Sequence, residues 1–329
     1  MDLWTDVRDQ YLRFAAEASD SPCFSSWSRH VADDPELLAW LGVLPQVKQQ
    51  PNLVFAAARW HGVQAPGPYT GLRDALLGDD GSIVATILER STQTNEAGRL
   101  ATLVPALAEV SARADDRPLS LVEVGASAGL CLYPDRWSYV WETDEGIVRA
   151  GDGPPLACRV SGPAPLPVHV PQVAARRGID LGPIDVRDPD ATAWLANLVW
   201  PEQEERRERL VQAVAITRAD PPRIEQGDLV ENLPRMVGEA AADGPVVVFH
   251  SAVIAYLDPA RRTAFEAVIR DLVDASACHW ISNEAAGVLP SVTATGPAVP
   301  PGHPTFVLGV DGRAVAWTHG HGRSLRWHP

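Results

Sequence analysis

A short apolar run followed by small residues is the feature that most constrains how this chain can fold. Residues 119–124, LSLVEV, have the composition of a strand buried in a parallel sheet. Residues 125–129, GASAG, let the backbone turn sharply and leave main-chain N–H groups open to a ligand. The pattern predicts a strand, a ligand-binding loop and then a helix. A tight turn without a ligand, as in any α/β protein, is the alternative.

The sequence on either side of this stretch predicts two parts with different folds. Residues 1–115 show helical spacing of apolar residues and no strand-like alternation, so we expect an all-helical N-terminal region. Residues 116–329 alternate strand-like runs with helical segments, which predicts a Rossmann-like, mainly parallel sheet. Within this part, residues 137–173 are rich in Gly and Pro and are expected to form an inserted loop or hairpin. The last strands should form an antiparallel hairpin turned at Asp311-Gly312. The expected fold class is therefore α/β.

Charge and hydropathy restrict the partners of the chain. The formal net charge is −14 and the pI is about 5.0, so no basic surplus exists to neutralise nucleic-acid phosphates. The charged N-terminus does not resemble a signal peptide, and no apolar run approaches the length of a membrane span. We therefore expect a cytoplasmic protein with a small-molecule substrate and no nucleic-acid or membrane partner. A homo- or hetero-oligomer is left open.

The cysteines and the C-terminal histidines do not form the pattern of a metal site. The four cysteines are scattered without C-x-x-C spacing, which argues against a zinc site and against a disulfide framework. His319 and His321 could share one face of a strand, but with His303 and His328 they are better explained as solvated hairpin residues. No metal is expected.

Glu123 lies at the end of the predicted strand, directly before the small residues. Its carboxylate would repel an anionic dinucleotide. A ligand with a cationic amino-acid part, such as S-adenosylmethionine, would instead gain from it. The residues therefore favour a site for S-adenosylmethionine over a site for a nicotinamide cofactor.

Polar residues end the next two predicted strands. His250 and Ser251 follow the run VVVF, and Asn283 and Glu284 end the strand after it. Because ligand sites of α/β proteins lie at the carboxyl ends of strands, we expect these residues near one cleft. His250 or a desolvated Glu284 could accept a proton, with Ser251 as a hydrogen-bond donor and Asn283 as a substrate contact. The alternative is a core histidine, and an acid neutralised by Arg99.

Asn95, Glu96 and Arg99 interrupt an otherwise apolar helical stretch. Polar groups there cost free energy unless they find partners, so they are expected to contact a substrate. Alternatively, they could make polar contacts between the two halves of the chain, or Glu96 and Arg99 could pair with each other at i and i+3.

Several motifs together resemble a known family. TNEAGR, EVGASAGLCLYPDRWSY, RRGIDLGPIDV, QGDLVENL, VVFHSAVIAYL and ISNEAAG are similar to an uncharacterised, mainly actinobacterial family known only as a domain of unknown function. The resemblance covers residues 5–329 and implies one compact architecture without a defined reaction.

A second resemblance begins at residue 118 and is to class I S-adenosylmethionine-dependent methyltransferases. It implies a cofactor loop containing Glu123, Gly125 and Gly129, with Ser127 standing where the family usually has a glycine. It also implies that Asp180 holds the ribose hydroxyls and that Asp228 lies near the adenine.

Three functional hypotheses follow. The first is a methyltransferase-like enzyme that methylates an amine or hydroxyl of a metabolite. The second is a cofactor-free enzyme on the same fold that uses Glu123, Asp228 and Glu284 for acid–base chemistry, such as cyclisation or elimination. The third is a non-catalytic binding protein, since a fold alone does not choose among functions.

Overall fold

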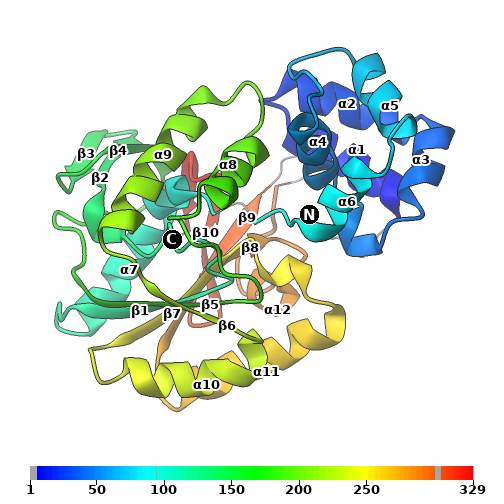
Figure 1. Ribbon diagram of the computed structural model, residues 1–329. Coiled ribbons are helices and arrows are strands. Elements are labelled where there is room, and N and C mark those ends of the chain that lie inside the picture. The colour runs from blue at the N-terminus through cyan, green and yellow to red at the C-terminus, as the bar shows by residue number, and fades with distance from the viewer. Residues whose placement is uncertain (1–5, 94, 301–304, 329) are drawn as a thin grey trace. The chain divides into compact units, whose positions relative to one another are not determined.

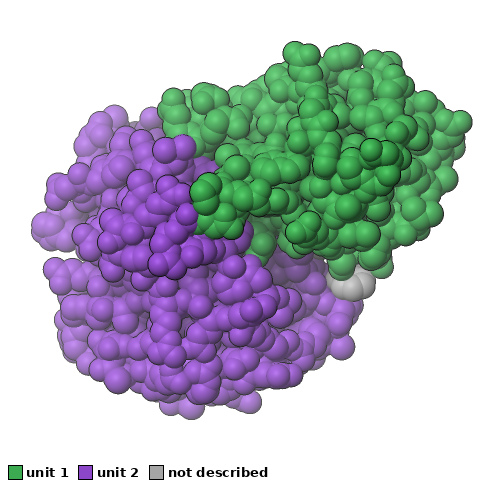
Figure 2. Space-filling model, in the orientation of Figure 1, with its two compact units in different colours: residues 1–94, 188–208 green, residues 95–187, 209–329 purple. Residues whose placement is uncertain are grey.

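The computed structural model describes residues 6–93, 95–300 and 305–328 (Figure 1). The chain divides into two compact units, coloured separately in Figure 2. Unit 1 combines residues 1–94 with 188–208, and unit 2 combines residues 95–187 with 209–329. This division differs from the sequence-based boundary at residue 115, because the helix that precedes residue 115 packs on the sheet of unit 2.

Unit 1 is helical, as the sequence predicts. Its helices are α1 (Val7–Glu17), α2 (Pro22–Ala32), α3 (Pro35–Leu41), α4 (Pro51–Trp60), α5 (Tyr69–Leu77), α6 (Ser82–Glu89) and α8 (Pro189–Leu198). The side chains of Asp34 and Asp188 accept backbone N–H groups at the starts of α3 and α8, and proline follows each of them at the first helical position. An aromatic cluster fills the interior, with Phe55 in ring contact with Tyr11 and Trp27.

Unit 2 contains one large sheet, whose strand order is β3-β2-β4-β11-β10-β9-β8-β7-β1-β5-β6. Its parallel centre consists of β1 (Leu119–Val124), β5 (Val173–Asp180), β6 (Arg223–Gln226), β7 (Val246–Ser251) and β8 (His279–Ala285). β9 (Phe306–Val310), β10 (Arg313–Thr318) and β11 (Ser324–Trp327) follow as an antiparallel series. The α/β class, the mostly parallel sheet and the antiparallel C-terminal strands are thus confirmed.

The segment 137–173 adds strands to the sheet. β2 (Ser138–Thr143) and β3 (Gly146–Ala150) form an antiparallel hairpin, and β4 (Pro155–Ser161) pairs in parallel with β2 and with β11. The hairpin is therefore joined to the sheet through β4, beyond the C-terminal strands.

Helices cover both faces of the sheet. α7 (Leu100–Arg113) contacts β8 and also β2 and β4, which lie far from β8 in the strand order, so the sheet curls around this helix. α10 (Leu229–Ala240) and α11 (Pro259–Asp274) lie on the other face (Figure 1). α9 (Glu204–Ala219) and the short α12 (Pro290–Thr293) complete the helices. Strand residues on the α10–α11 face include Val122, Val124 and Trp280. Since side chains alternate along a strand, Glu123 points to the α7 face.

No helix follows the GASAG loop, contrary to the sequence prediction. The chain passes through turns to a single 3₁₀ turn, η3 (Pro134–Arg136), before entering β2. Gly125, Ser127 and Gly129 have φ values of 66°, 50° and 71°. Alternating left-handed residues prevent the run of right-handed residues that a helix needs.

Candidate functional site

The candidate site lies at the carboxyl ends of β1 and β7, where the direction of chain progression across the sheet reverses. β5 and β6 lie on one side of β1, and β7 and β8 lie on its other side. Ligands of open α/β sheets bind at such a reversal point. Ser127 after β1 and Ala252 after β7 both have positive φ, 50° and 60°. Left-handed non-glycine residues cost free energy and occur at functional sites, so these two residues agree with the position that the strand order indicates.

Glu123 is the central titratable group at this edge. Its side chain is buried, and its Oε1 atom accepts a hydrogen bond from Asn95 Nδ2 at 3.2 Å. Its Oε2 atom has no hydrogen-bond partner among the residues that the structure describes. Burial raises the pKa of Glu123 to about 8, against the opposing effects of the Asn95 hydrogen bond and the charge of Arg99. The carboxyl group is therefore mostly protonated at pH 7.

Asn95, Glu96 and Arg99 connect the start of unit 2 to the loops at this edge. The side-chain oxygen of Asn95 accepts the backbone N–H of Leu130, so one amide contacts both the loop and Glu123. Glu96 Oε1 lies 3.0 Å from Arg209 Nη1 and also accepts the N–H of Gly98. Arg209 was not expected at the site, because the run PEQEERRER has the pattern of a solvated helix face.

Arg99 is held by main-chain carbonyls. Its Nη1 donates to the carbonyl oxygen of Ser251 at 2.9 Å, and its Nε donates to the carbonyl oxygen of Gly320 at 2.8 Å. Asn283 Nδ2 donates to Ser251 Oγ at 3.0 Å, while Thr318 Oγ1 donates to Asn283 Oδ1 at 2.7 Å. The carboxyl-edge cluster, defined as Asn95, Glu96, Arg99, Glu123, Ser251 and Asn283, thus unites six of the sequence-predicted residues.

His250 and Glu284 do not join this cluster. Strand alternation places both on the α10–α11 face, where the His250 ring contacts Phe265 and Trp280. His250 Nε2 lies 3.0 Å from Trp280 Nε1, which can only donate, so the proton of the neutral imidazole is on Nδ1. Nδ1 donates to Glu284 Oε1 at 2.7 Å. The expected common cleft beneath the TNEAGR segment is therefore not formed, because the sheet lies between these residues and the carboxyl-edge cluster.

Glu284 also binds the backbone that follows β7. Its Oε1 atom accepts the N–H groups of Val253 and Ile254 at 3.0 and 3.2 Å. Both His250 and Glu284 are buried, with exposed fractions of 0% and 2%. His250 and Glu284 were expected to be catalytic, and their observed contacts fix the segment after β7 to β8.

The residues expected to bind S-adenosylmethionine are engaged within the protein. Asp180 Oδ2 accepts the N–H of Ser127 and Oδ1 accepts the N–H of Gly182, each at 2.8 Å. A Cβ at Gly125 would lie 2.4 Å from Val253 Cγ1, so the side chain of Val253 covers this glycine.

Gly129 is also packed against the protein, since a Cβ at this position would lie 2.8 Å from Pro222 Cγ. Asp228 caps α10 through the N–H groups of Val230 and Glu231, and pairs with Arg261. The loop glycines permit close packing of the protein against itself.

Within the described ranges, no group of three or more His, Cys, Asp or Glu side chains is arranged to hold a metal ion. His319 and His321 contact each other, with ring centroids 5.4 Å apart, and His321 donates its backbone N–H to His319 Nδ1. His303 lies outside the described residues. Among the helices of the described chain, none is both long and apolar enough to cross a membrane.

Comparison with known families agrees with the first resemblance seen in the sequence. The family described as "Uncharacterized protein conserved in bacteria (DUF2332)" matches residues 8–327. The chain belongs to this family. Neither a curated protein nor a solved structure matches the chain. The family match includes residues of both units, so both are parts of the DUF2332 domain.

Proposed function

We propose that this DUF2332 protein is a small-molecule enzyme on a methyltransferase-like fold, working by acid–base chemistry through Glu123 without S-adenosylmethionine. The observation that carries the proposal is the carboxyl group of Glu123. It is buried, its pKa is raised to about 8, and its Oε2 atom has no partner among the described residues. A buried polar atom without a hydrogen bond is costly, which supports a ligand as its missing partner.

The strand order supports the location of this site. The central strands β6-β5-β1-β7-β8 follow the Rossmann order, in which the first strand lies at the reversal point. Glu123 is on that first strand, and the left-handed residues Ser127 and Ala252 follow β1 and β7. The fold by itself does not define a reaction, so the proposal depends on the chemistry of Glu123.

The protonated Glu123 can serve as a general acid at neutral pH. Its Oε2 atom would donate a proton to a leaving group or carbonyl oxygen of the substrate, and the carboxylate that remains would then accept a proton from an amine. Asn95 holds the other oxygen, Oε1, and so fixes the orientation of the carboxyl group. A group whose pKa is near the working pH is suited to both steps. The substrate class is an amine-bearing metabolite that undergoes cyclisation or elimination.

The proposal includes a cytoplasmic location. The four cysteines, Cys23, Cys131, Cys158 and Cys278, are all free and buried in the structure. Free thiols are typical of a reducing compartment.

Thermal unfolding with added ligands is the first test. The ligands are S-adenosylmethionine, S-adenosylhomocysteine and a panel of amine-bearing metabolites. A ligand at a hundred times its Kd stabilises the folded state by about 2.7 kcal/mol. We expect stabilisation by an amine and none by the two cofactor forms. Stabilisation by S-adenosylmethionine would instead support the methyltransferase hypothesis and overturn the cofactor-free reaction.

Turnover of the stabilising metabolite is the second test. Glu123→Gln keeps the shape of the side chain and an oxygen for Asn95, but it removes the transferable proton. We expect turnover to fall about 10²–10⁴-fold. Glu205→Gln, at an exposed glutamate, is the matched control and should keep the wild-type rate. An unchanged rate in Glu123→Gln would exclude Glu123 as the acid. Saturable binding without any turnover would favour the non-catalytic binding protein.

A further inference from the structure

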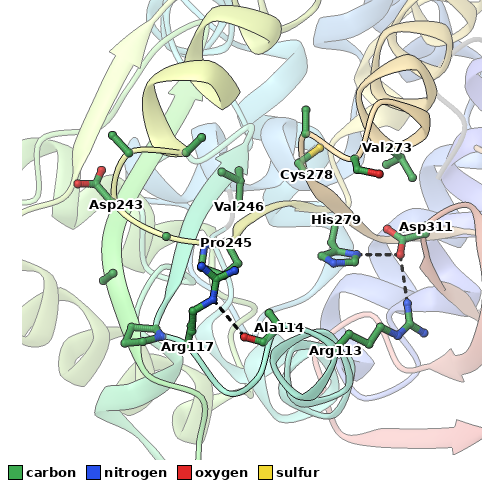
Figure 3. Close-up of a pocket in the computed structure, with 17 residues that line it drawn as sticks. Arg113, Ala114, Arg117, Asp243, Pro245, Val246, Val273, Cys278, His279 and Asp311 are labelled. Carbon is green, nitrogen blue, oxygen red and sulfur yellow. Dashed lines mark hydrogen bonds and ion pairs between the residues drawn. The ribbon is translucent and has the colours of Figure 1, made fainter.

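A cavity lies at the amino edge of the parallel strands, where the strands begin. Its volume is about 810 Å³, within the range of small-molecule sites. Its walls come from the end of α7 and the start of β1, from the segments that lead into β7 and β8, and from the turn after β9 (Figure 3). We call it the amino-edge cavity. It lies at the opposite edge of the sheet from Glu123.

Most charges around the amino-edge cavity are paired. Arg113 pairs with Glu109 and with Asp311, whose Oδ2 is 3.2 Å from Arg113 Nη1. Asp243 Oδ2 lies 2.6 Å from Arg177 Nη2. Arg113 and Asp243 are thus engaged by side chains of opposite charge, so neither is the group that would recognise a ligand.

Arg117, unlike Arg113 and Asp243, makes no ion pair with a described residue. Its Nε donates to the carbonyl oxygen of Ala114 at 3.3 Å, while Nη1 and Nη2 make no hydrogen bond or ion pair with any residue that the structure describes. A guanidinium group with two unoccupied nitrogens can bind a carboxylate or phosphate through parallel hydrogen bonds. Arg117 therefore gives this cavity a site for negative charge.

His279 faces the same space from the other side (Figure 3). Its Nδ1 lies 3.0 Å from Asp311 Oδ2, and Asp311 Oδ1 accepts the N–H of Trp280 at 2.8 Å. Burial acts to raise the pKa of Asp311, but the hydrogen bonds from His279 and Trp280 outweigh it and lower the pKa. The ionised Asp311 orients the ring with Nδ1 toward itself. Nε2 has no partner among the described residues. In the doubly protonated ring, Nδ1 donates to Asp311 and Nε2 is left to donate to an anion.

The remaining wall is suited to binding an organic molecule. It includes the apolar side chains of Ala114, Pro118, Val246 and Val273. Burial raises the pKa of Cys278 to about 12, so this thiol stays protonated and is not a nucleophile. The cavity thus combines an apolar wall with Arg117 and His279, and offers no activated nucleophile on Cys278.

We propose that the amino-edge cavity binds a small organic anion, with its carboxylate or phosphate group held between Arg117 and His279 and its apolar part against the wall. The position of Arg117 can also be explained without a ligand. The arginine follows the C-terminal end of α7, where a cation is stabilised by the helix dipole. The experiment must therefore measure anion binding directly, since helix stability alone would not distinguish the two.

Calorimetric titration with phenyl phosphate, phenylacetate, inorganic phosphate and the neutral phenylacetamide tests the proposal. We expect saturable binding of the two aryl anions to the wild-type protein, weaker binding of inorganic phosphate and none of phenylacetamide. Arg117→Gln and His279→Gln should each weaken the binding of the aryl anions about 10- to 100-fold. Gln at position 279 keeps a donor for Asp311. Arg149→Gln, at an exposed arginine of β3, is the matched control and should bind like the wild type.

Two outcomes would overturn the proposal. One is the absence of saturable binding of both aryl anions to the wild-type protein. The other is equal binding by the Arg117→Gln, His279→Gln and Arg149→Gln variants. Glu123→Gln should not change anion binding, so the amino-edge cavity is tested independently of the proposed enzyme activity.

Discussion

At the scale of a single residue, the raised pKa of Glu123 makes stability depend on pH. The pKa is about 8 in the folded protein, compared with an ordinary value of 4.5. The folded state therefore keeps a proton that the unfolded chain has released between these values. The contribution to stability is fully present below pH 4.5 and is lost as pH rises through about 8, by up to about 5 kcal/mol.

Glu123→Gln removes this titration. Urea unfolding at pH 5, 7 and 9 should show the variant gaining stability relative to the wild type as pH rises. The difference between the two proteins isolates Glu123 from all other titrating groups, and Glu205→Gln should show no such trend. A wild-type–variant difference that stays constant with pH would mean that Glu123 ionises at an ordinary pKa.

Close packing and a positive φ require glycine at position 129. It has φ 71°, and a Cβ there would lie 2.8 Å from Pro222 Cγ and 3.0 Å from Ile224 Cδ1. Gly129→Ala should lower the free energy of unfolding by about 2–5 kcal/mol, from backbone strain plus overpacking. Gly62, with φ 93° and no atom of the described residues within 4 Å of its Cβ position, is the control for strain alone. Equal losses in Gly129→Ala and Gly62→Ala, measured by urea unfolding, would refute the packing argument.

At the scale of elements, Glu284 fixes the segment after β7 to β8. One carboxylate oxygen accepts from His250 Nδ1 and from the N–H groups of Val253 and Ile254. Glu284→Ala leaves the buried donors of His250 and Ile254 and the half-buried N–H of Val253 without their acceptor, so the free energy of unfolding should fall by about 3–5 kcal/mol. Amide hydrogen exchange at Val253 and Ile254 should accelerate. Glu205→Ala is the control. If the amides of Val253 and Ile254 still exchange slowly in Glu284→Ala, contacts other than those of Glu284 hold the loop.

For the whole molecule, a truncation can be predicted from unit 1, because this unit is built from two separate segments, residues 1–94 and 188–208. In unit 1, Trp194 of α8 contacts Trp60, with ring centroids 5.7 Å apart, and Asn197 Nδ2 donates to the carbonyl oxygen of Ala56. A fragment of residues 95–329 keeps α8 but loses these partners. It should bind a hydrophobic dye and associate in gel filtration.

The control is the same fragment, residues 95–329, with Trp194, Leu198 and Trp200 replaced by serine. These side chains are buried in the whole protein, so replacing them should reduce both dye binding and association. If the unmodified fragment is monomeric and does not bind the dye, the segment 188–208 does not depend on residues 1–94 to cover its apolar side chains.

Much of the fold could be predicted from the sequence because its signals are local. The run at 119–124 and the run VVVF form buried strands as expected, and the apolar spacing of the first ninety residues forms helices. The face on which a strand residue lies could not be predicted in the same way. β7 and β8 are buried along most of their length, so the alternation of their side chains between the two faces leaves no pattern in hydropathy. His250 and Glu284 were for this reason expected on the same side as Asn95.

Some elements can be recognised from a few neighbouring residues, because their chemistry is local. Asp34-Pro35 and Asp188-Pro189 start helices because an aspartate accepts the free N–H groups and proline fixes φ. The protonation of Glu123, the proton position on His250 and the lack of partners for Arg117 Nη1 and Nη2 among the described residues follow instead from the folded arrangement. These depend on burial and on partners distant in sequence, such as Asn95 for Glu123 and Trp280 for His250. Desolvation and hydrogen bonding act only once the chain has brought such groups together.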